Sequence, residues 1–433
     1  MKGSGIYPLV VMLLLLVGFP SGLGWAQNTD GGDQSTITLL VQQIRELQKQ
    51  TGELQEKVKA LEAEKGQVTP SPEAAEASTA AHEQISDRIG AIEAWDKAHG
   101  IQWRGFGEVD YKVLDQRKPE LGAAGFNPGS AGNFYTANTT LLLTSRISDK
   151  TSVLSEIEFE EEEAQAYRVS LERILLKYDY DDHLKMSFGR YHTGIGYYNT
   201  AFHSGAWLQT TANRPLIMEF AHEGGLLPTQ AIGVSITGSV PSGKAGLNYI
   251  AEYGTSDTNR PDINGSGLSD DENNGNHVNL GIFLRPGHLP GLQIGGSYYH
   301  DQVSNSETVF SPRYGQTILN GHVVYVAHGT EFLNEGFLIR YAQLHTSVVF
   351  DTPAFYSQIS QRFGRIRPFF RYQYINGSAH NPIHEDVGLR HGPSFGARYE
   401  LNDYIAFKAQ LDHTLRRGQP DLNGLHLQLA FTF

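Results

Sequence analysis

The last nine residues, LHLQLAFTF (residues 425–433), alternate between apolar and polar side chains and end on a phenylalanine. Leucine, or phenylalanine near the end, occupies the odd positions, and most even positions are polar. Because successive side chains of a β-strand point to opposite faces, this segment has one apolar face and one largely polar face. Such a strand fits a membrane-spanning β-barrel, whose outer face meets hydrocarbon and whose inner face meets water.

The same period of two recurs from residue 101 to the end of the chain. In residues 404–416, for example, Phe407 and Leu411 share one face, and Lys408 and Gln410 share the other. We therefore predict an all-β fold, a 16-stranded antiparallel transmembrane β-barrel. The predicted strands are residues 101–115, 133–148, 151–163, 168–180, 184–193, 229–239, 245–255, 276–286, 291–303, 316–330, 335–346, 354–363, 366–376, 390–401, 404–416 and 424–433.

The connections between these strands alternate between short and long. Tight turns are expected at residues 148–150 and 181–183, whereas residues 116–132, 194–228 and 256–275 form long connections rich in Gly, Asn and Asp. Short turns on one rim and long loops on the other are typical of bacterial outer-membrane barrels. Barrels of sixteen to eighteen strands leave an aqueous channel, so we expect a water-filled interior. A β-sandwich or a soluble barrel does not account for apolar outward faces together with an export signal.

The N-terminus carries the pattern of that signal. Lys2 precedes an apolar run over residues 9–19, and small residues stand before Gln27. This order predicts a signal peptide over residues 1–26, and the alternative is a buried N-terminal helix.

A heptad pattern follows the predicted signal peptide. Apolar residues from Ile37 to Leu61 are separated by alternating steps of three and four, which predicts a coiled coil. The alternative is an amphipathic helix that packs on the body of the protein. The expected domains are a signal peptide (1–26), a coiled-coil stalk (27–65), a linker (66–80), a short helix (81–100) and the barrel (101–433).

Composition excludes several classes of protein. The mean hydropathy of −0.35 and the lack of long apolar stretches after the signal argue against a bundle of transmembrane helices. The chain has no Cys, which excludes thiolate metal sites and disulfides. A net charge of −13 argues against a nucleic-acid partner. No sequence feature predicts a cofactor.

Charged residues on the predicted inner face are candidates for lining a pore. If Ile157 and Phe159 face lipid, the acidic residues of the third strand point inward, and the fourth strand places basic residues opposite them. Facing rows of opposite charge would create a field across the water path, although a polar lining that merely keeps the pore wet is the alternative. The predicted pore-lining residues are Arg104, Glu156, Glu158, Glu160, Arg173, Lys177, Arg367, Arg371, Arg398, Lys408 and Arg416.

The longest connection, residues 194–228, carries more apolar and aromatic side chains than a water-exposed loop normally does. It either folds into the barrel and narrows it or packs at a subunit interface. Histidines occur in and beside it, but no standard zinc-binding spacing appears, so we predict no metal site. The predicted constriction residues are His203, Trp207, Arg214 and Glu219.

The chain resembles outer-membrane porins of the phosphate-selective O/P group and their coiled-coil-bearing relatives. The similar segments are RGFGEV at residues 104–109, residues 171–178 of the predicted fourth strand, and LKMSFG at residues 184–189. The resemblance implies a trimer whose third loop folds inward. It does not imply phosphate selectivity, because Lys244 and Lys408 are the only lysines after residue 200. Three arginines, Arg367, Arg371 and Arg398, could form only a partial ladder.

We therefore expect a homotrimeric porin in the bacterial outer membrane, in contact with its lipids, with the coiled coil in the periplasm. It would allow passive diffusion of small hydrophilic solutes or ions, and it would not be an enzyme. Two alternatives remain open. The chain could tether the membrane to the cell wall through its coiled coil, or it could transport a specific and even hydrophobic substrate. An enzymatic barrel is disfavoured because no catalytic motif stands out.

Overall fold

The structure is a computed structural model of the chain. The predicted signal peptide, coiled-coil stalk, linker and short helix, which together make up residues 1–100, lie outside the described residues. The described residues are 101–115, 132–136, 138–161, 167–202, 206–219, 225–256, 276–304, 312–378, 380–381, 383–384 and 387–433.

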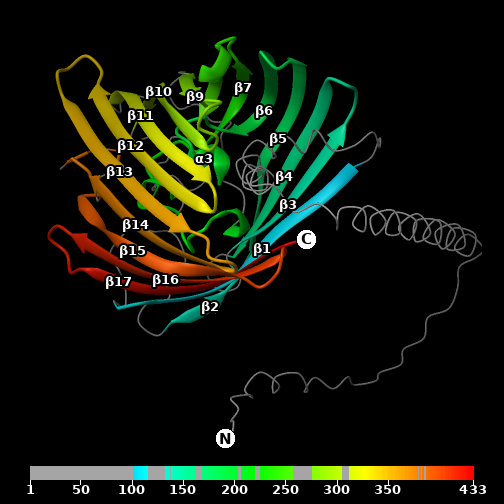
Figure 1. Cartoon of the computed structure of the whole chain (residues 1–433). Coiled ribbons are helices and arrows are strands. Elements are labelled where there is room, and N and C mark those ends of the chain that lie inside the picture. Colours follow the sequence, from blue (N-terminus) through cyan, green and yellow to red (C-terminus); the bar gives the residue numbers. More distant parts are fainter. Residues whose placement is uncertain are drawn as a thin grey trace, which may run out of the picture. The chain divides into compact units, whose positions relative to one another are not determined.

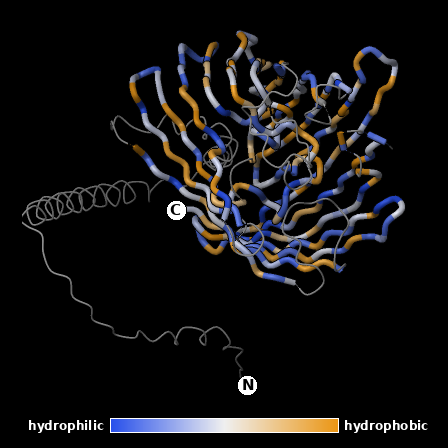
Figure 2. The backbone as a smooth tube through the Cα atoms, turned by 180° about the vertical axis from the view of Figure 1, so that it is seen from behind, coloured by the Kyte–Doolittle hydropathy of each residue, from blue (hydrophilic) through white to orange (hydrophobic). Residues whose placement is uncertain are grey.

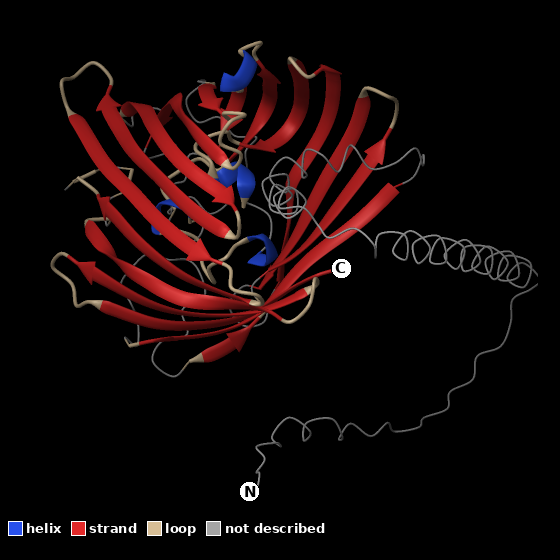
Figure 3. Cartoon of the chain, viewed as in Figure 1, coloured by secondary structure: helices blue, strands red, loops and turns tan. Residues whose placement is uncertain are grey.

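Strands make up most of the described chain (Figure 3). The first half contains β1 (Ile101–Leu114), β2 (Asn133–Tyr135), β3 (Asn138–Arg146), β4 (Thr151–Glu161), β5 (Tyr167–Asp181), β6 (Leu184–His192), β7 (Gln230–Ser239), β8 (Leu247–Ser256) and β9 (His277–Leu284). The second half contains β10 (Leu292–Ser304), β11 (Arg313–Ala327), β12 (Thr330–Gln343), β13 (Val349–Gln361), β14 (Ile366–Asn376), β15 (Leu389–Glu400), β16 (Ile405–Arg416) and β17 (Leu422–Thr432).

These strands form one antiparallel sheet that closes on itself (Figure 1). The closing pair is β1 with β17, in which Phe106 lies opposite Thr432 and Leu114 lies opposite Gly424. Both β2 and β3 pair with β1 at different heights, so they are two pieces of one strand of the wall. The barrel thus has sixteen strands, which confirms the predicted fold class.

One predicted turn is wrong. The sequence pattern places a strand boundary between residues 330 and 335, whereas β11 and β12 are joined at His328 and Gly329. Both turn residues have positive φ angles, 53° and 76°. A histidine rarely adopts this left-handed conformation, so the sequence gives a weak turn signal here.

The alternation of side chains follows the prediction for the barrel wall. In β16, Phe407 and Leu411 are 46% and 44% exposed, whereas Lys408 and Gln410 between them are buried. Figure 2 shows the resulting mixture of hydrophilic and hydrophobic positions along the strands. The outer face is therefore apolar, and the inner face carries the polar and charged residues.

A β-bulge interrupts this alternation between β4 and β5. Glu156 lies opposite Arg173, but the next residue, Ile157, lies opposite Leu171, so Glu172 is an extra residue. Strict alternation would place Leu171 and Arg173 on the same face. With the bulge, Leu171 is exposed on the outside, while Arg173 is buried and reaches Glu156 on the inside.

The connection between β6 and β7, which we call loop 193–229, contains three short helical turns among its described residues. They are α3 (Tyr198–Ala201), η4 (Ala206–Leu208) and η5 (Leu216–Met218), and a fourth, η7 (Gly243–Ala245), lies in the turn after β7. Figure 1 shows α3 inside the ring of strands. No helix in the described part of the chain is both long and apolar enough to cross a membrane.

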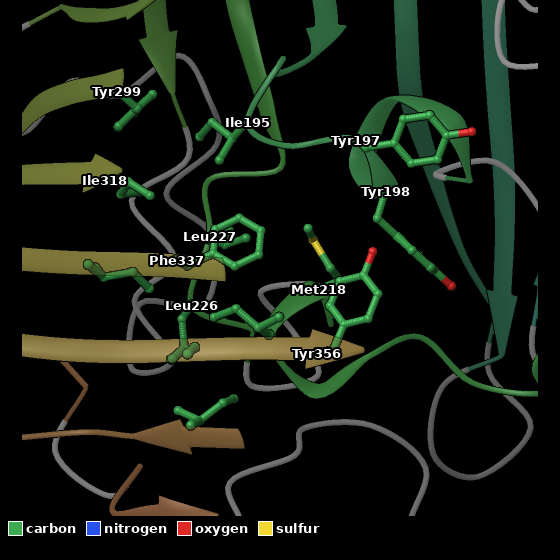
Figure 4. Close-up of a cluster of buried hydrophobic side chains, with 14 of the residues drawn as sticks. Ile195, Tyr197, Tyr198, Met218, Leu226, Leu227, Tyr299, Ile318, Phe337 and Tyr356 are labelled. Carbon is green, nitrogen blue, oxygen red and sulfur yellow. The ribbon is translucent and has the colours of Figure 1, made fainter. Parts of the chain in front are cut away.

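Apolar side chains of loop 193–229 pack against the inner faces of neighbouring strands (Figure 4). Tyr198, Met218 and Leu227 from the loop belong to one buried cluster with Ile318 of β11 and Tyr356 of β13. The cluster extends from β10 to β14, so side chains of the loop pack against this side of the barrel interior.

We expect the two faces of β6 to respond differently to the same charge. Phe188 points outward and is 42% exposed, whereas its neighbour Ser187 points inward and lies opposite Lys177. Replacing Phe188 by Glu should lower the free energy of unfolding in lipid by about 1–2 kcal/mol, because the carboxylate enters hydrocarbon. Urea titration of the barrel in vesicles measures this value. Ser187→Glu is the matched control, and an equal loss in both variants would contradict the assigned faces.

Candidate functional site

The two ends of loop 193–229 are hydrogen-bonded to each other where the loop leaves and rejoins the barrel wall. The backbone N–H of Thr193 donates to the carbonyl of Thr229 at 3.0 Å, and the Thr193 hydroxyl donates to the carbonyl of Pro228 at 2.6 Å. The side-chain amide of Asn199 donates to the carbonyls of Thr193 and Thr229 at 2.9 Å and 3.0 Å. These bonds fix the direction in which the loop enters the barrel.

Two buried carboxylates hold the beginning of the loop, residues 194–198, which we call its first arm. Glu252 of β8 accepts the backbone N–H of Gly194 at 2.9 Å. Glu335 of β12 accepts those of Tyr197 at 2.6 Å and Tyr198 at 2.9 Å. A carboxylate that accepts backbone N–H groups makes charge-assisted hydrogen bonds, which are stronger than neutral ones. The start of α3 is therefore anchored to β12.

Three buried cations hold a later part of the loop, residues 206–216, which contains η4 and which we call the second arm. Arg371 of β14 is fully buried and donates to the carbonyl of Asn213 at 3.0 Å. Arg398 of β15 donates to the carbonyls of Trp207 and Gln209, and Lys408 of β16 donates to those of Ala206 and Thr211. These cations therefore bond to the backbone of the chain itself.

Three glutamine side chains complete the attachment of this arm. Gln410 accepts the backbone N–H of Ala212 at 2.9 Å, and Gln373 accepts that of Leu216 at 3.0 Å. Gln428 donates to the carbonyl of Ala212 at 3.0 Å. The loop thus crosses from β14 to β17 with bonds to each of these strands.

Aromatic and cationic groups also stabilise the loop internally. The guanidinium of Arg214 lies 5.3 Å from the ring centre of Tyr198 and donates through Nε to the carbonyl of Met218 at 2.5 Å. Burial raises the pKa of Tyr198 to about 12, although the nearby Arg214 and Arg371 oppose the rise. The phenol is therefore neutral at physiological pH and donates to Gln209 at 3.1 Å.

A different arrangement occupies the wall formed by β1, β4 and β5, where carboxylates gather. Glu156 pairs with Arg173 at 2.5 Å, and Glu160 forms an ion pair with Arg168. Glu158 lies between Glu156 and Glu160 in β4 and interacts electrostatically with four carboxylates. It has no hydrogen bond within the described part of the chain. The carboxylates that surround it are Glu172, Glu160, Glu156 and Glu108.

The remaining predicted residues lie outside these two groups. Arg104 is exposed near the start of β1, and Lys177 is half-buried opposite Ser152. Arg367 lies 3.7 Å from Glu331, and Arg416 donates to the carbonyl of Pro420 at 2.8 Å.

Of the predicted constriction residues, Trp207 contributes its carbonyl to Arg398, and Arg214 stabilises the loop from within. Glu219 is half-buried and interacts electrostatically with Arg371. His203 lies outside the described residues. No three His, Asp or Glu side chains among the described ranges are placed to hold a metal ion.

Sequence reasoning missed Glu252, Glu335 and Gln410 as residues that hold the loop. Their only sequence signal is a polar residue at an inward position of a strand, and many other residues share that signal. The predicted cations Arg371, Arg398 and Lys408 are close together in the structure, but their partners in the loop were not predicted.

The chain is similar to known proteins in its fold. No protein-family model and no curated protein matches the chain. Outer-membrane expressed OmpT of Vibrio cholerae has a TM-score of 0.53 at 10% identity, and the match covers 78% of this chain and 99% of that one. The Salmonella typhi OmpF complex with daunomycin has a TM-score of 0.52 at 13% identity, with 77% and 97% covered. The outer membrane channel DcaP of Acinetobacter baumannii has a TM-score of 0.52 at 9% identity, with 78% and 99% covered.

At these identities the likeness shows the fold alone. The chain shares the barrel of outer-membrane porins and channels.

We expect Arg371 to be needed for the position of the second arm. Arg371→Gln removes charge-assisted bonds to Asn213, so the loop should open more often and chymotrypsin should cleave at Trp207 roughly tenfold faster. Cleavage rates followed by mass spectrometry check this expectation. Arg416→Gln is the matched control, because its bond goes to Pro420 in another connection. Equal protection in all three proteins would contradict an anchoring role for Arg371.

A second connection, residues 377–388, also packs into the interior. Its residues Ile383 and Val387 belong to the same buried cluster as loop 193–229. Nε2 of His384 lies 3.0 Å from the hydroxyl of Tyr341 in β12. Burial lowers the pKa of His384 from its ordinary value of 6.5 to about 4.

This shift predicts a loss of stability in acid. Above pH 6.5 the imidazole is neutral in both states, so the shift has no effect there. As the pH falls from 6.5 to 4, only the unfolded chain takes up the proton, and the free energy of unfolding should decrease by about 2 kcal/mol between pH 7 and 5. Urea titrations at both pH values measure the change. His384→Gln should lack this component, and an unchanged pH dependence in that variant would contradict it.

Proposed function

We propose that the chain is a diffusion porin of the outer membrane, through which small hydrophilic solutes and ions pass passively. The observation that carries the proposal is the attachment of loop 193–229 to inward-facing side chains from β8 to β17. A loop bonded through both arms is a fixed partition that narrows the lumen without moving as solutes pass. Sixteen-stranded barrels are wide enough to keep an aqueous passage beside such a loop.

We also propose that the passage prefers cations. The cations Arg371, Arg398 and Lys408 already donate to carbonyl groups of the loop. The wall that contains Glu158 brings its carboxylate together with those of Glu108, Glu156, Glu160 and Glu172, and it holds Arg173 and Arg168 as partners of Glu156 and Glu160. Rings or rows of acidic side chains favour cations in pores. Arg371 and Arg398 of the partial arginine ladder would therefore support the loop and not form an anion path.

The outer-membrane location and the homotrimer belong to the same proposal. Its support is the exposed apolar outer face, the predicted signal peptide and the resemblance to the O/P group of porins and their coiled-coil-bearing relatives. The alternative of a transporter for hydrophobic substrates has less support, because Tyr198, Met218 and Leu227 are buried in the cluster and are not available to line a passage.

Planar bilayers test this function. The purified chain without residues 1–26 should give conductance steps in groups of three, and a KCl gradient should give a reversal potential that indicates preference for potassium. Glu160→Gln should bring the permeability ratio of potassium to chloride closer to one by roughly two- to threefold, since the wall that contains Glu158 loses one negative charge.

Asp149→Asn is the matched control, because Asp149 is fully exposed in a short turn and should not affect selectivity. A folded barrel that conducts no current would contradict the porin. A preference for chloride would contradict only the cation path.

A further inference from the structure

A cavity of about 340 Å³ lies beneath loop 193–229, at the rim where the short turns are. Its lining comes from α3, η4, the inner faces of β11, β12 and β15, and the turns after β13 and β15. Pockets that bind small molecules typically begin near this size, and they combine apolar walls with a few polar groups. This cavity has both features.

The loop supplies an aromatic wall. The rings of Tyr197 and Phe202 are 6.0 Å apart and nearly perpendicular. The guanidinium of Arg398 lies over the ring of Trp207, 4.8 Å from the ring centre. Leu208 and Val326 extend the apolar surface. Aromatic rings arranged in this way bind a flat or bulky apolar group by edge and face contacts.

Charges deep in the cavity neutralise one another. Arg398 pairs with Glu400 at 2.8 Å. Glu331 lies 3.7 Å from Arg367, a residue that does not itself line the cavity. Glu331 also accepts hydrogen bonds from Thr210 and Gln358. These groups are therefore occupied by the protein itself and leave no net charge for a ligand.

Charges of both signs remain at the rim of the cavity. Arg362 and Arg365, in the turn after β13, are exposed, and within the described residues each donates one hydrogen bond to a backbone carbonyl, at 3.0 Å and 3.4 Å. Because a guanidinium has five N–H donors, most of their donor capacity faces the solvent. Asp403, in the turn after β15, is exposed and has no ion pair to the described residues.

We propose that this cavity binds small zwitterions with an apolar side group, the class to which apolar amino acids and their short peptides belong. The carboxylate would meet Arg362 and Arg365, the ammonium would meet Asp403, and the side group would contact Tyr197 and Trp207. A simple anion leaves the Asp403 carboxylate unmatched, and a simple cation leaves the two arginines unmatched. The site goes beyond the proposed diffusion function, because binding here does not require an open passage.

Three probes that share one ring test the charge assignment. They are phenylalanine, 3-phenylpropionate, which lacks the ammonium, and 2-phenylethylamine, which lacks the carboxylate. Calorimetric titration of the folded chain in detergent should show the tightest binding for phenylalanine. Each single-charge probe should bind roughly tenfold more weakly, since it loses a charge-assisted contact.

Variants at the rim connect the probes to the residues. The double variant Arg362→Gln, Arg365→Gln should weaken phenylalanine and 3-phenylpropionate roughly tenfold and leave 2-phenylethylamine unchanged, whereas Asp403→Asn should weaken phenylalanine and 2-phenylethylamine. Lys185→Gln is the control, because Lys185 pairs with Asp182 at another short turn. Heat-modifiable mobility in gels confirms that each variant is folded.

Several outcomes would overturn the proposal. They are absence of binding by all three probes, equal binding of phenylalanine and 3-phenylpropionate, or rim variants that bind like the unmodified chain. Bilayer recordings on the same preparation separate this site from the proposed function. A barrel that conducts but binds no probe refutes the site alone, and a barrel that binds phenylalanine but conducts no current refutes the channel alone.

Discussion

Hydrogen bonds between buried charged side chains and the backbone of loop 193–229 organise the interior of this barrel. A chain segment inside a barrel carries N–H and C=O groups that lose water, and each of them needs a partner. Glu335 provides acceptors for the first arm, and Arg371 and Lys408 provide donors for the second. The same bonds offset the cost of burying these charges, so loop and wall depend on each other.

The charged side chains that bind the loop lie on one side of the barrel interior. The apolar side chains of the loop and of residues 377–388 pack against β10 to β14, and the cations of β14 to β16 are bonded to the loop. The carboxylates on β1, β4 and β5 lie elsewhere on the wall, where Glu156 pairs with Arg173 and Glu160 pairs with Arg168. The two sides of the barrel interior therefore differ: one side is packed and positions the loop, and the other side carries the group of carboxylates around Glu158.

Periodicity predicted the barrel well and its irregularities poorly. The sixteen strands and the inward direction of Lys408 and Gln410 follow from alternation in the sequence. The turn at His328 does not, because a left-handed histidine has no clear sequence signature. The bulge at Glu172 also escapes a period of two, since it inserts one residue and changes which face the following side chains occupy.

By itself, the sequence determined the fold class, the apolar outer face and the inward position of most charged residues, because these properties depend on neighbours two residues apart in the chain. Only the tertiary structure decided what those inward charges contact. Arg371 meets Asn213 across 158 positions of sequence, and Glu335 meets Tyr197 across 138. No local pattern encodes such a pairing, since it depends on how the closed barrel brings a loop from one wall to side chains of another.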